Sequence, residues 1–290
     1  MSSLPPDGAN AEQIRFWNEV AGPKWVALQE AIDRQIRPLG LRAMDGARLR
    51  PGERVIDVGC GCGDTTIEIA RRVGEGGAVL GVDISTGMLE RVRAAAAAAG
   101  LGNVRVENAD AQTHRLGAGD WDVLYSRFGI MFFVDPLAAF SNLRAALAPG
   151  GRLAFVCWQP MAVNPWMSLA LMAAAQHLAL PPPPAPEAPG PFSFGDDARV
   201  RRILAGAGFS GVVLEPLHET LTIGATNDLD RAVDFLLQIG PAGAALREAD
   251  PALRPKVFAA VREALAPHHT PEGVRLESAC WIVTGRAAER

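Results

Sequence analysis

The chain has 290 residues, of which 49% are hydrophobic and 21% are charged, and its formal net charge at pH 7 is −4. This balance is typical of a globular protein that can bury a core, but the length alone does not choose between one large domain and two small ones. The sequence holds no run of Lys and Arg, so its charge gives no support to a nucleic-acid partner.

Targeting and membrane signals are also missing from the sequence. The first ten residues lack a basic region followed by an apolar run, so they do not predict a secretory signal. The most apolar long segment, residues 161–180, is interrupted by Asn164, Pro165 and His177, which argues against a membrane span. Four cysteines are too few for a disulfide scaffold. We therefore expect a cytoplasmic protein.

The first fifty residues predict one or two helices. Apolar residues recur at roughly helical spacing between Gln13 and Arg48, and Gly22-Pro23 is expected to break the run. Short apolar strands and helices then alternate. The expected strands are 54–58, 78–82, 104–107, 121–126 and 152–158, and the expected helices are 64–73, 86–99 and 136–147. This alternation predicts right-handed βαβ units and a parallel sheet covered on both faces.

The pattern changes after residue 158. We expect a helix at 161–180, a Pro-rich extended loop to 191, a helix at 197–207, a strand at 212–223, a mostly helical insertion at 227–266 and a last strand at 279–284. The sequence shows no internal repeat and no clean linker, which favours a single domain over 1–290. Its parts are N-terminal helices (1–49), a core (50–158), a Pro-rich insertion (159–196) and a C-terminal part (197–290) with a helical cap at 227–277.

A glycine-rich loop carries the strongest chemical signal. Asp57-Val58-Gly59-Cys60-Gly61-Cys62-Gly63-Asp64 joins a strand to a helix. Glycine lets such a loop turn tightly and lets a ligand touch the backbone. The spacing Gly-x-Gly-x-Gly differs from the dinucleotide fingerprint Gly-x-Gly-x-x-Gly. The flanking carboxylates of Asp57 and Asp64 would oppose a pyrophosphate but suit a cationic ligand such as a sulfonium amino acid. A plain glycine turn is the simpler alternative.

Two further acids end neighbouring strands. Asp83 follows Gly63 by 20 residues, the spacing at which an acid in doubly wound folds accepts ribose hydroxyls. It could instead cap the helix that follows. Asp110 ends the third strand and would join the same crevice, where its carboxylate could accept from an exocyclic amine. Alone, Asp110 would be a solvated turn residue.

An aromatic loop, Ser126-Arg127-Phe128-Gly129-Ile130-Met131-Phe132-Phe133, follows the fourth strand. The substrate is expected beside it, although Phe132 and Phe133 also suit the core. Arg127 needs a partner, because a guanidinium at a strand end near the crevice is costly to bury alone.

Together these motifs resemble a class I S-adenosylmethionine (SAM)-dependent methyltransferase. The resemblance rests on Asp57-x-Gly59-x-Gly61-x-Gly63, on Asp83, on Asp110-Ala111 and on Pro149-Gly150-Gly151 before the fifth strand, and it spans residues 50–158. Gly206-x-Gly208-Phe209 is similar to the turn before the family's sixth strand. The pattern is similar to the ubiquinone and menaquinone C-methyltransferase group of small-molecule enzymes. It is specific for the cofactor and poorly specific for the substrate.

The resemblance implies a Rossmann-like, doubly wound, seven-stranded sheet whose last strand is antiparallel, and it implies roles for individual residues. Asp57, Gly59, Gly61 and Gly63 would line the methionyl part of SAM, and Cys60 between them would also contact the cofactor. Asp83 would hold the ribose, and Ile84 and Met88 would pack on the adenine. Asp110 and Ala111 would meet its edge, and Ser126 and Arg127 would lie near the sulfonium. Trp17 and Trp25 would close over the cofactor, with cation–π attraction to the sulfonium. Simple hydrophobic anchoring of these helices is an equal alternative.

The sequence leaves the chemistry of the acceptor open. Because a sulfonium is already a strong electrophile, alignment and exclusion of water can supply much of the acceleration. A base is needed only if the nucleophile must lose a proton, and His114 is the candidate, four residues after Asp110. Cys60 and Cys62 are separated by one residue, unlike the usual zinc spacing, so no metal is expected.

The segments 159–194 and 227–277 are apolar and rich in Ala, which suits a lid over an apolar or aromatic small-molecule acceptor. The same composition would serve a homodimer interface. Three alternatives stay open: an NAD(P)-dependent oxidoreductase, disfavoured by the glycine spacing; a non-catalytic SAM-binding protein; and a related enzyme with another reaction. The sequence does not separate O-, N-, S- and C-methylation.

Overall fold

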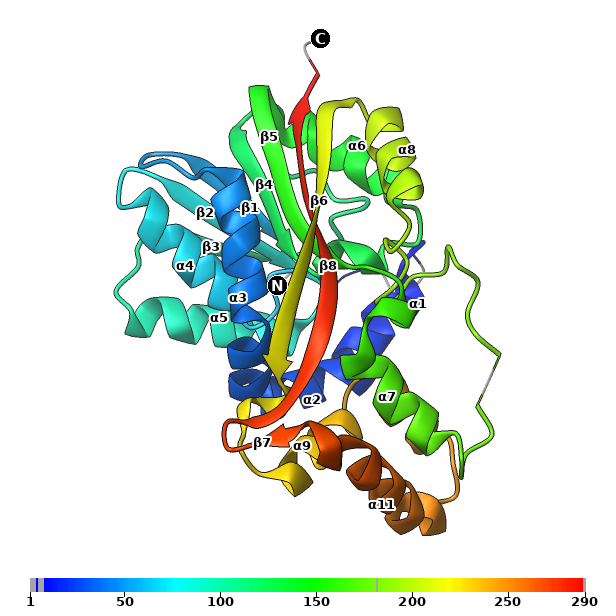
Figure 1. The fold of residues 1–290 in the computed structure, drawn as a ribbon. Helices are drawn as coiled ribbons and strands as arrows, with labels where there is room; N and C mark the ends of the chain where they lie inside the picture. Colours follow the sequence, from blue (N-terminus) through cyan, green and yellow to red (C-terminus); the bar gives the residue numbers. More distant parts are fainter. Residues whose placement is uncertain (1–3, 5–7, 181, 289–290) are drawn as a thin grey trace.

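The fold is built on one central sheet (Figure 1), and the computed structural model describes residues 4, 8–180 and 182–288. The main path of the sheet has the order β3-β2-β1-β4-β5-β8-β6, and β8 runs antiparallel to both β5 and β6. The predicted doubly wound, seven-stranded sheet with an antiparallel last strand is therefore confirmed. Its strands are β1 (Arg54–Val58), β2 (Ala78–Asp83), β3 (Val104–Asn108), β4 (Trp121–Arg127), β5 (Leu147–Trp158), β6 (Phe209–Thr222) and β8 (Gly273–Ala287), and β7 (His269–Thr270) pairs with β8 at its start.

Helices cover both faces of the sheet (Figure 1). α3 (Gln29–Ala47), α4 (Asp64–Val73) and α5 (Thr86–Ala98) lie on one face, and α6 (Pro136–Ala146) and α8 (Asp197–Gly206) lie on the other. Phe140 of α6 packs on Phe155 of β5 and on Phe209 of β6, with ring centroids 5.7 and 6.3 Å apart. Aromatic pairs at this spacing stabilise the layer in addition to the apolar area that they bury.

A close contact between α3 and β4 positions the helix over the strand ends. The Tyr125 hydroxyl donates to the Gly40 carbonyl at 2.8 Å, and both groups are buried. A Cβ at Gly40 would lie 2.7 Å from Cδ of Arg127, so only glycine permits this approach. The second half of α3 is thereby held against β4.

The N-terminal segment is helical, as predicted, but its break lies elsewhere. α1 (Ala11–Arg15) leads through a π-helical turn (Phe16–Val20) into α2 (Ala21–Ala27), and the chain bends at Leu28 before α3. The prediction of a break at Gly22-Pro23 is wrong, because Pro23 lies in the first turn of α2, where its missing N–H is not needed. A Cβ at Gly22 would lie 2.0 Å from the Trp17 carbonyl oxygen, so glycine here accommodates the π-turn.

A helical cap lies beyond the carboxyl end of β6 and the amino end of β8 (Figure 1). It contains α7 (Pro165–Ala174), α9 (Leu229–Leu236), α10 (Gly240–Arg247) and α11 (Arg254–Leu265), and α7 packs against α10 and α11. The mostly helical insertion at 227–266 is confirmed. The helix expected at 161–180 is shorter than predicted. α7 begins at Pro165, after a turn in which the buried Asn164 amide donates to the Gln159 and Ala279 carbonyls, and a turn at Ala175–His177 ends it. Among the described residues, no helix is both long and apolar enough to cross a bilayer.

Candidate functional site

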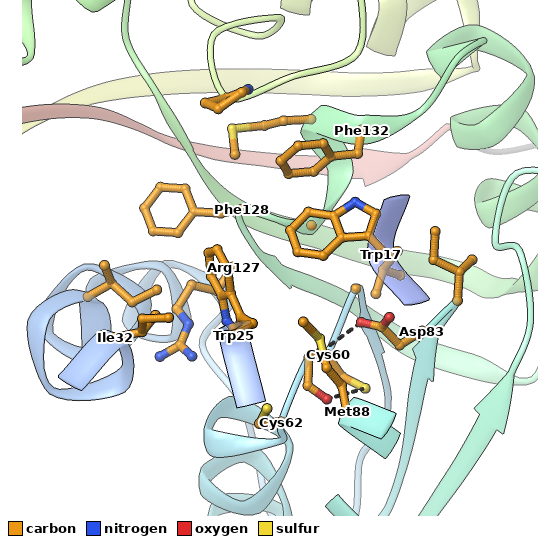
Figure 2. Close-up of a pocket in the computed structure, with 18 of the residues that line it drawn as sticks. Trp17, Trp25, Ile32, Cys60, Cys62, Asp83, Met88, Arg127, Phe128 and Phe132 are labelled. Atoms are coloured by element: carbon orange, nitrogen blue, oxygen red, sulfur yellow. Dashed lines mark hydrogen bonds between the residues drawn. The ribbon is translucent and has the colours of Figure 1, made fainter. Parts of the chain in front are cut away.

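A deep cavity lies at the carboxyl ends of β1, β2 and β4, between the N-terminal helices, α3 and the cap. Figure 2 shows Asp83 and Met88 at one end of this cavity and Arg127 and Ile32 at the other, with Phe132 above. Ligands of open parallel sheets bind at this edge, so its position agrees with the crevice predicted from the strand-end acids.

The glycine loop forms the floor of the cavity. Gly59 and Gly61 have φ angles of +64° and +55°, a conformation that glycine adopts without steric cost. A Cβ at Gly59 would lie 2.6 Å from Cα of Gly129, so the two loops cross backbone to backbone. A Cβ at Gly61 would meet only the sulfur of Met88, at 3.9 Å. The Gly61 backbone is therefore open to a ligand.

Two motif residues support the loop from below. A Cβ at Gly63 would lie 2.8 Å from Val92, so this glycine lets α4 begin close against α5. The Asp57 side chain is fully buried, and its Oδ2 accepts from the hydroxyls of Thr65 at 2.8 Å and Thr66 at 2.7 Å, while Oδ1 has no partner. Burial raises the pKa of Asp57 to about 6. Neither Asp57 nor Gly63 lines the cavity.

Asp83 links the second strand to the glycine loop. One carboxylate oxygen accepts from the Gly61 N–H and the other from the Ser85 N–H, both at 2.8 Å. Desolvation raises the pKa of Asp83, and these backbone hydrogen bonds oppose the increase. Because each carboxylate oxygen can accept a second hydrogen bond, Asp83 can also receive hydroxyl donors from the cavity that it lines.

Asp110 is tied to the N-terminal segment by a residue that the sequence did not single out. The buried Asn10 amide donates to Asp110 Oδ2 at 2.7 Å, and its oxygen accepts from the Val134 N–H at 3.2 Å. The other Asp110 oxygen accepts from the Gln112 N–H at 2.9 Å. Asn10 thus fixes the start of the helical lid to two strand-end loops. A single buried amide carries no periodic signal, so no sequence pattern could have found it.

Arg127 has the partners that its position requires. Its guanidinium donates to Asp33 of α3 at 2.7 Å and to Asp64 of α4 at 2.8 Å. Both carboxylates stabilise the cation, and they hold the pKa of Arg127 above its ordinary value despite burial. Asp33 also lines the cavity, and desolvation raises its pKa. Asp33 was not predicted, because in the sequence it is one acid on an amphipathic helix.

Aromatic side chains form the roof. Trp17, on the π-turn, meets Trp25 and Phe132 edge to face, with centroids 5.5 and 4.9 Å apart. Phe128 stacks on Trp158 at 4.2 Å with an interplanar angle of 10°. Phe128 has a φ of +62°, which is strained for a bulky residue and is a feature of functional sites.

Most of the residues predicted to bind the cofactor lie around the same cavity. Eleven predicted residues line the cavity: Trp17, Trp25, Gly59, Cys60, Gly61, Asp83, Ile84, Met88, Asp110, Ala111 and Arg127. Ser126 does not line it, because its buried hydroxyl donates to the Val58 carbonyl at 2.7 Å and ties β4 to β1. His114 lies outside the cavity wall and is largely exposed, with Nε2 2.5 Å from Glu107. The structure therefore gives His114 no contact with the cavity.

The charges suit a cationic nucleoside ligand. Among the described residues that line the cavity there are three carboxylates, those of Asp33, Asp83 and Asp110, but only one guanidinium, which is already paired. Such a site would repel a pyrophosphate and would attract a sulfonium. The open backbone at Gly61 and the acceptor capacity of Asp83 fit the adenosine and thioether portions of SAM.

Comparisons with known proteins agree with this chemistry. Residues 55–151 match the model of a methyltransferase domain. The chain is 36% identical over 118 residues to aklanonic acid methyltransferase DauC of Streptomyces sp. strain C5. The matched region is 41% of this chain and 54% of that enzyme, so the chain spans about half of the enzyme's length. It is 33% identical over 197 residues to nocamycin O-methyltransferase of Saccharothrix syringae, which covers 65% of this chain and 70% of that enzyme.

A solved structure shows the same fold. YcgJ from Bacillus subtilis superposes with a TM-score of 0.57 at 15% sequence identity, covering 87% of this chain and 98% of that chain. The sheet order, the cavity at the strand ends and the extended similarity to the nocamycin enzyme agree with the resemblance carried by the glycine and acid motifs. This protein belongs to the family of SAM-dependent methyltransferases.

Proposed function

We propose that this protein transfers the methyl group of SAM to a small aromatic or otherwise flat, apolar acceptor. The observation that carries the proposal is that the glycine loop, Asp83 and a group of aromatic side chains line the same cavity. Asp83 would accept from the ribose hydroxyls, Ile84 and Met88 would pack on the adenine, and Asp110 would lie at its edge. Asp57 and Gly63 would act indirectly by shaping the loop.

The acceptor would lie against the stacked pair of Phe128 and Trp158. Trp166 of the cap continues this surface, with its ring centroid 4.9 Å from that of Trp158. Met131 and Met167 also line this part of the cavity, and flexible thioethers adapt to the outline of a ligand. A flat aromatic acceptor would replace water on these surfaces at little cost in conformational entropy.

The chain itself would act mainly by alignment and by exclusion of water. Bound SAM supplies an electrophilic methyl group on a sulfonium. The N-terminal helices, held by Asn10, would close one side of the cavity, and the cap would close the other. Among the described residues that line the cavity there is no His, Lys or Tyr. Holding the nucleophile in line with the methyl group is therefore the larger contribution that we propose.

A titration tests the cofactor first. Calorimetry of the purified protein with SAM, S-adenosylhomocysteine (SAH) and NAD should show micromolar binding of SAM or SAH and none of NAD. Transfer of a labelled methyl group to phenols, quinones or amines would then identify the acceptor class. Binding of NAD alone would restore the oxidoreductase alternative, and binding of SAM without transfer to any acceptor would favour a non-catalytic role.

The variant Asp83→Ala tests the ribose contact. Loss of a charged hydrogen-bond partner should weaken SAM binding by roughly 1–3 kcal/mol. Asp196→Ala is a matched control, because Asp196 is an exposed carboxylate that caps α8 and does not line the cavity. Equal SAM affinity in both variants, measured by calorimetry, would remove Asp83 from this role.

We also propose a cytoplasmic location, with a small-molecule acceptor as the partner. The four cysteines Cys60, Cys62, Cys157 and Cys280 are free and buried, which suits a reducing compartment.

A further inference from the structure

Asp33 ends a chain of buried and half-buried ion pairs. Arg127 joins Asp33 to Asp64, and Arg37 joins Asp64 to Glu68. Arg72 then joins Glu68 to Asp45, at 3.0 and 3.1 Å, so the chain connects the cavity wall to the outer surface of α3 and α4.

This series of ion pairs contains four carboxylates but only three guanidinium groups. The two terminal carboxylates have one guanidinium partner each. Asp45, at the outer end, is 65% exposed, so water solvates its charge. Asp33, at the inner end, is 17% exposed and lines the cavity. The uncompensated negative charge therefore lies at Asp33, and a cation in the cavity would balance it.

The glycine loop connects Asp33 to the predicted ribose position. Asp83 accepts from the Gly61 N–H of this loop, and Gly61 and Cys62 line the same cavity as Asp33 and Arg127. A ligand whose ribose meets Asp83 and which extends along the loop would therefore reach Asp33 and Arg127. The end of SAM that extends this way is its amino acid, which carries an ammonium group. Asp57 does not compete for that group, because its side chain is fully buried and does not line the cavity.

We propose that Asp33 binds the ammonium group at the amino-acid end of the cofactor and that Arg127 holds the Asp33 carboxylate in position. The inference rests on the proposed use of SAM and adds to it a residue outside the glycine and acid motifs. Asp33 would be a binding residue, and the sulfonium and the acceptor would lie away from it.

The test compares two ligands in the variant Asp33→Asn. SAH carries the amino acid, whereas 5′-methylthioadenosine keeps the adenosine and the thioether but lacks the amino acid. Calorimetry should show SAH binding weakened roughly 10- to 100-fold, as expected for loss of a hydrogen bond between charged groups. Binding of 5′-methylthioadenosine should stay within about twofold of wild type, which also shows that the variant keeps its cavity. Asp33→Ser serves the same purpose if Asp33→Asn does not fold.

Two controls separate the outcomes. Asp45→Asn removes the carboxylate at the other end of the same chain and should leave SAH binding unchanged. Decarboxylated SAM, which keeps the ammonium group, should lose affinity in Asp33→Asn as SAH does. If binding of SAH and of 5′-methylthioadenosine were weakened equally, or if SAH binding were unchanged, the proposed role of Asp33 would be overturned but the proposed cofactor would not. Wild-type protein that binds neither ligand would overturn the proposed cofactor as well.

Discussion

At the scale of single residues, three glycines without side chains shape the floor of the cavity. Gly59, Gly61 and Gly63 share a left-handed backbone but serve three purposes: a backbone crossing with Gly129, an open floor for a ligand, and close packing of two helices. The motif was predicted as a unit, and only the surroundings of each glycine separate these purposes. Of the three, only Gly61 has free space where a Cβ would lie, with the Met88 sulfur as its one neighbour within 4 Å.

Gly61→Ala should abolish cofactor binding in a folded protein. The new methyl group would occupy space beside the ligand, and the positive φ would add backbone strain. Gly100→Ala is a matched control, because Gly100 has a φ of +66° and no atom within 4 Å of its Cβ position. Both variants should lose about 1 kcal/mol of stability by urea denaturation, whereas only Gly61→Ala should lose SAH binding by calorimetry. Normal SAH binding in Gly61→Ala would contradict the position of the loop in the site.

At the scale of elements, the approach of α3 to β4 organises one end of the cavity. This helix carries Asp33 and packs its Gly40 against Tyr125 and the stem of Arg127. The sequence predicts an amphipathic helix here, but helical periodicity gives only the buried face and not the partner on which that face packs. The contact between Asp33 and Arg127, 94 residues apart, follows from docking.

Gly40→Ala should destabilise the protein and disturb the site together. A methyl group 2.7 Å from Arg127 Cδ must displace either the helix or the guanidinium, at a cost of roughly 1–3 kcal/mol. Gly87→Ala, in α5, has open space around its Cβ and should instead stabilise the protein by a few tenths of a kcal/mol. Thermal and urea denaturation measure both effects. A Gly40→Ala protein as stable as Gly87→Ala would show that the α3–β4 approach is loose.

At the scale of the whole molecule, the site concentrates buried acids at one edge of the sheet. Burial raises the pKa of Asp33, Asp57 and Asp83 together, so the folded protein retains protons that the unfolded chain would release. For such a group the contribution to stability is complete below its ordinary pKa and is lost as the pH rises through the folded value. The site is therefore assembled at some cost in stability near neutral pH.

Asp57→Asn should change the pH dependence of unfolding. The wild-type carboxyl has a pKa of about 6 in the folded protein, against 3.8 ordinarily, whereas the amide does not titrate. The free energy of unfolding of the variant, relative to wild type, should therefore increase between pH 4 and pH 7 by on the order of 2–3 kcal/mol. Urea denaturation across this range measures the difference. A difference independent of pH would contradict the raised pKa.

The sequence by itself determined the sheet, the loop and the cofactor chemistry, since apolar periodicity, glycine spacing and strand-end acids are local patterns. β1 and α4 begin and end where they were predicted, and eleven proposed site residues line one cavity. Only the tertiary structure showed that Asp57 and Ser126 face inward, that His114 lies outside, and that Asn10 and Asp33 line the cavity. Those facts depend on contacts between residues far apart in the chain, which are fixed when helices dock on the sheet and buried polar groups find their partners.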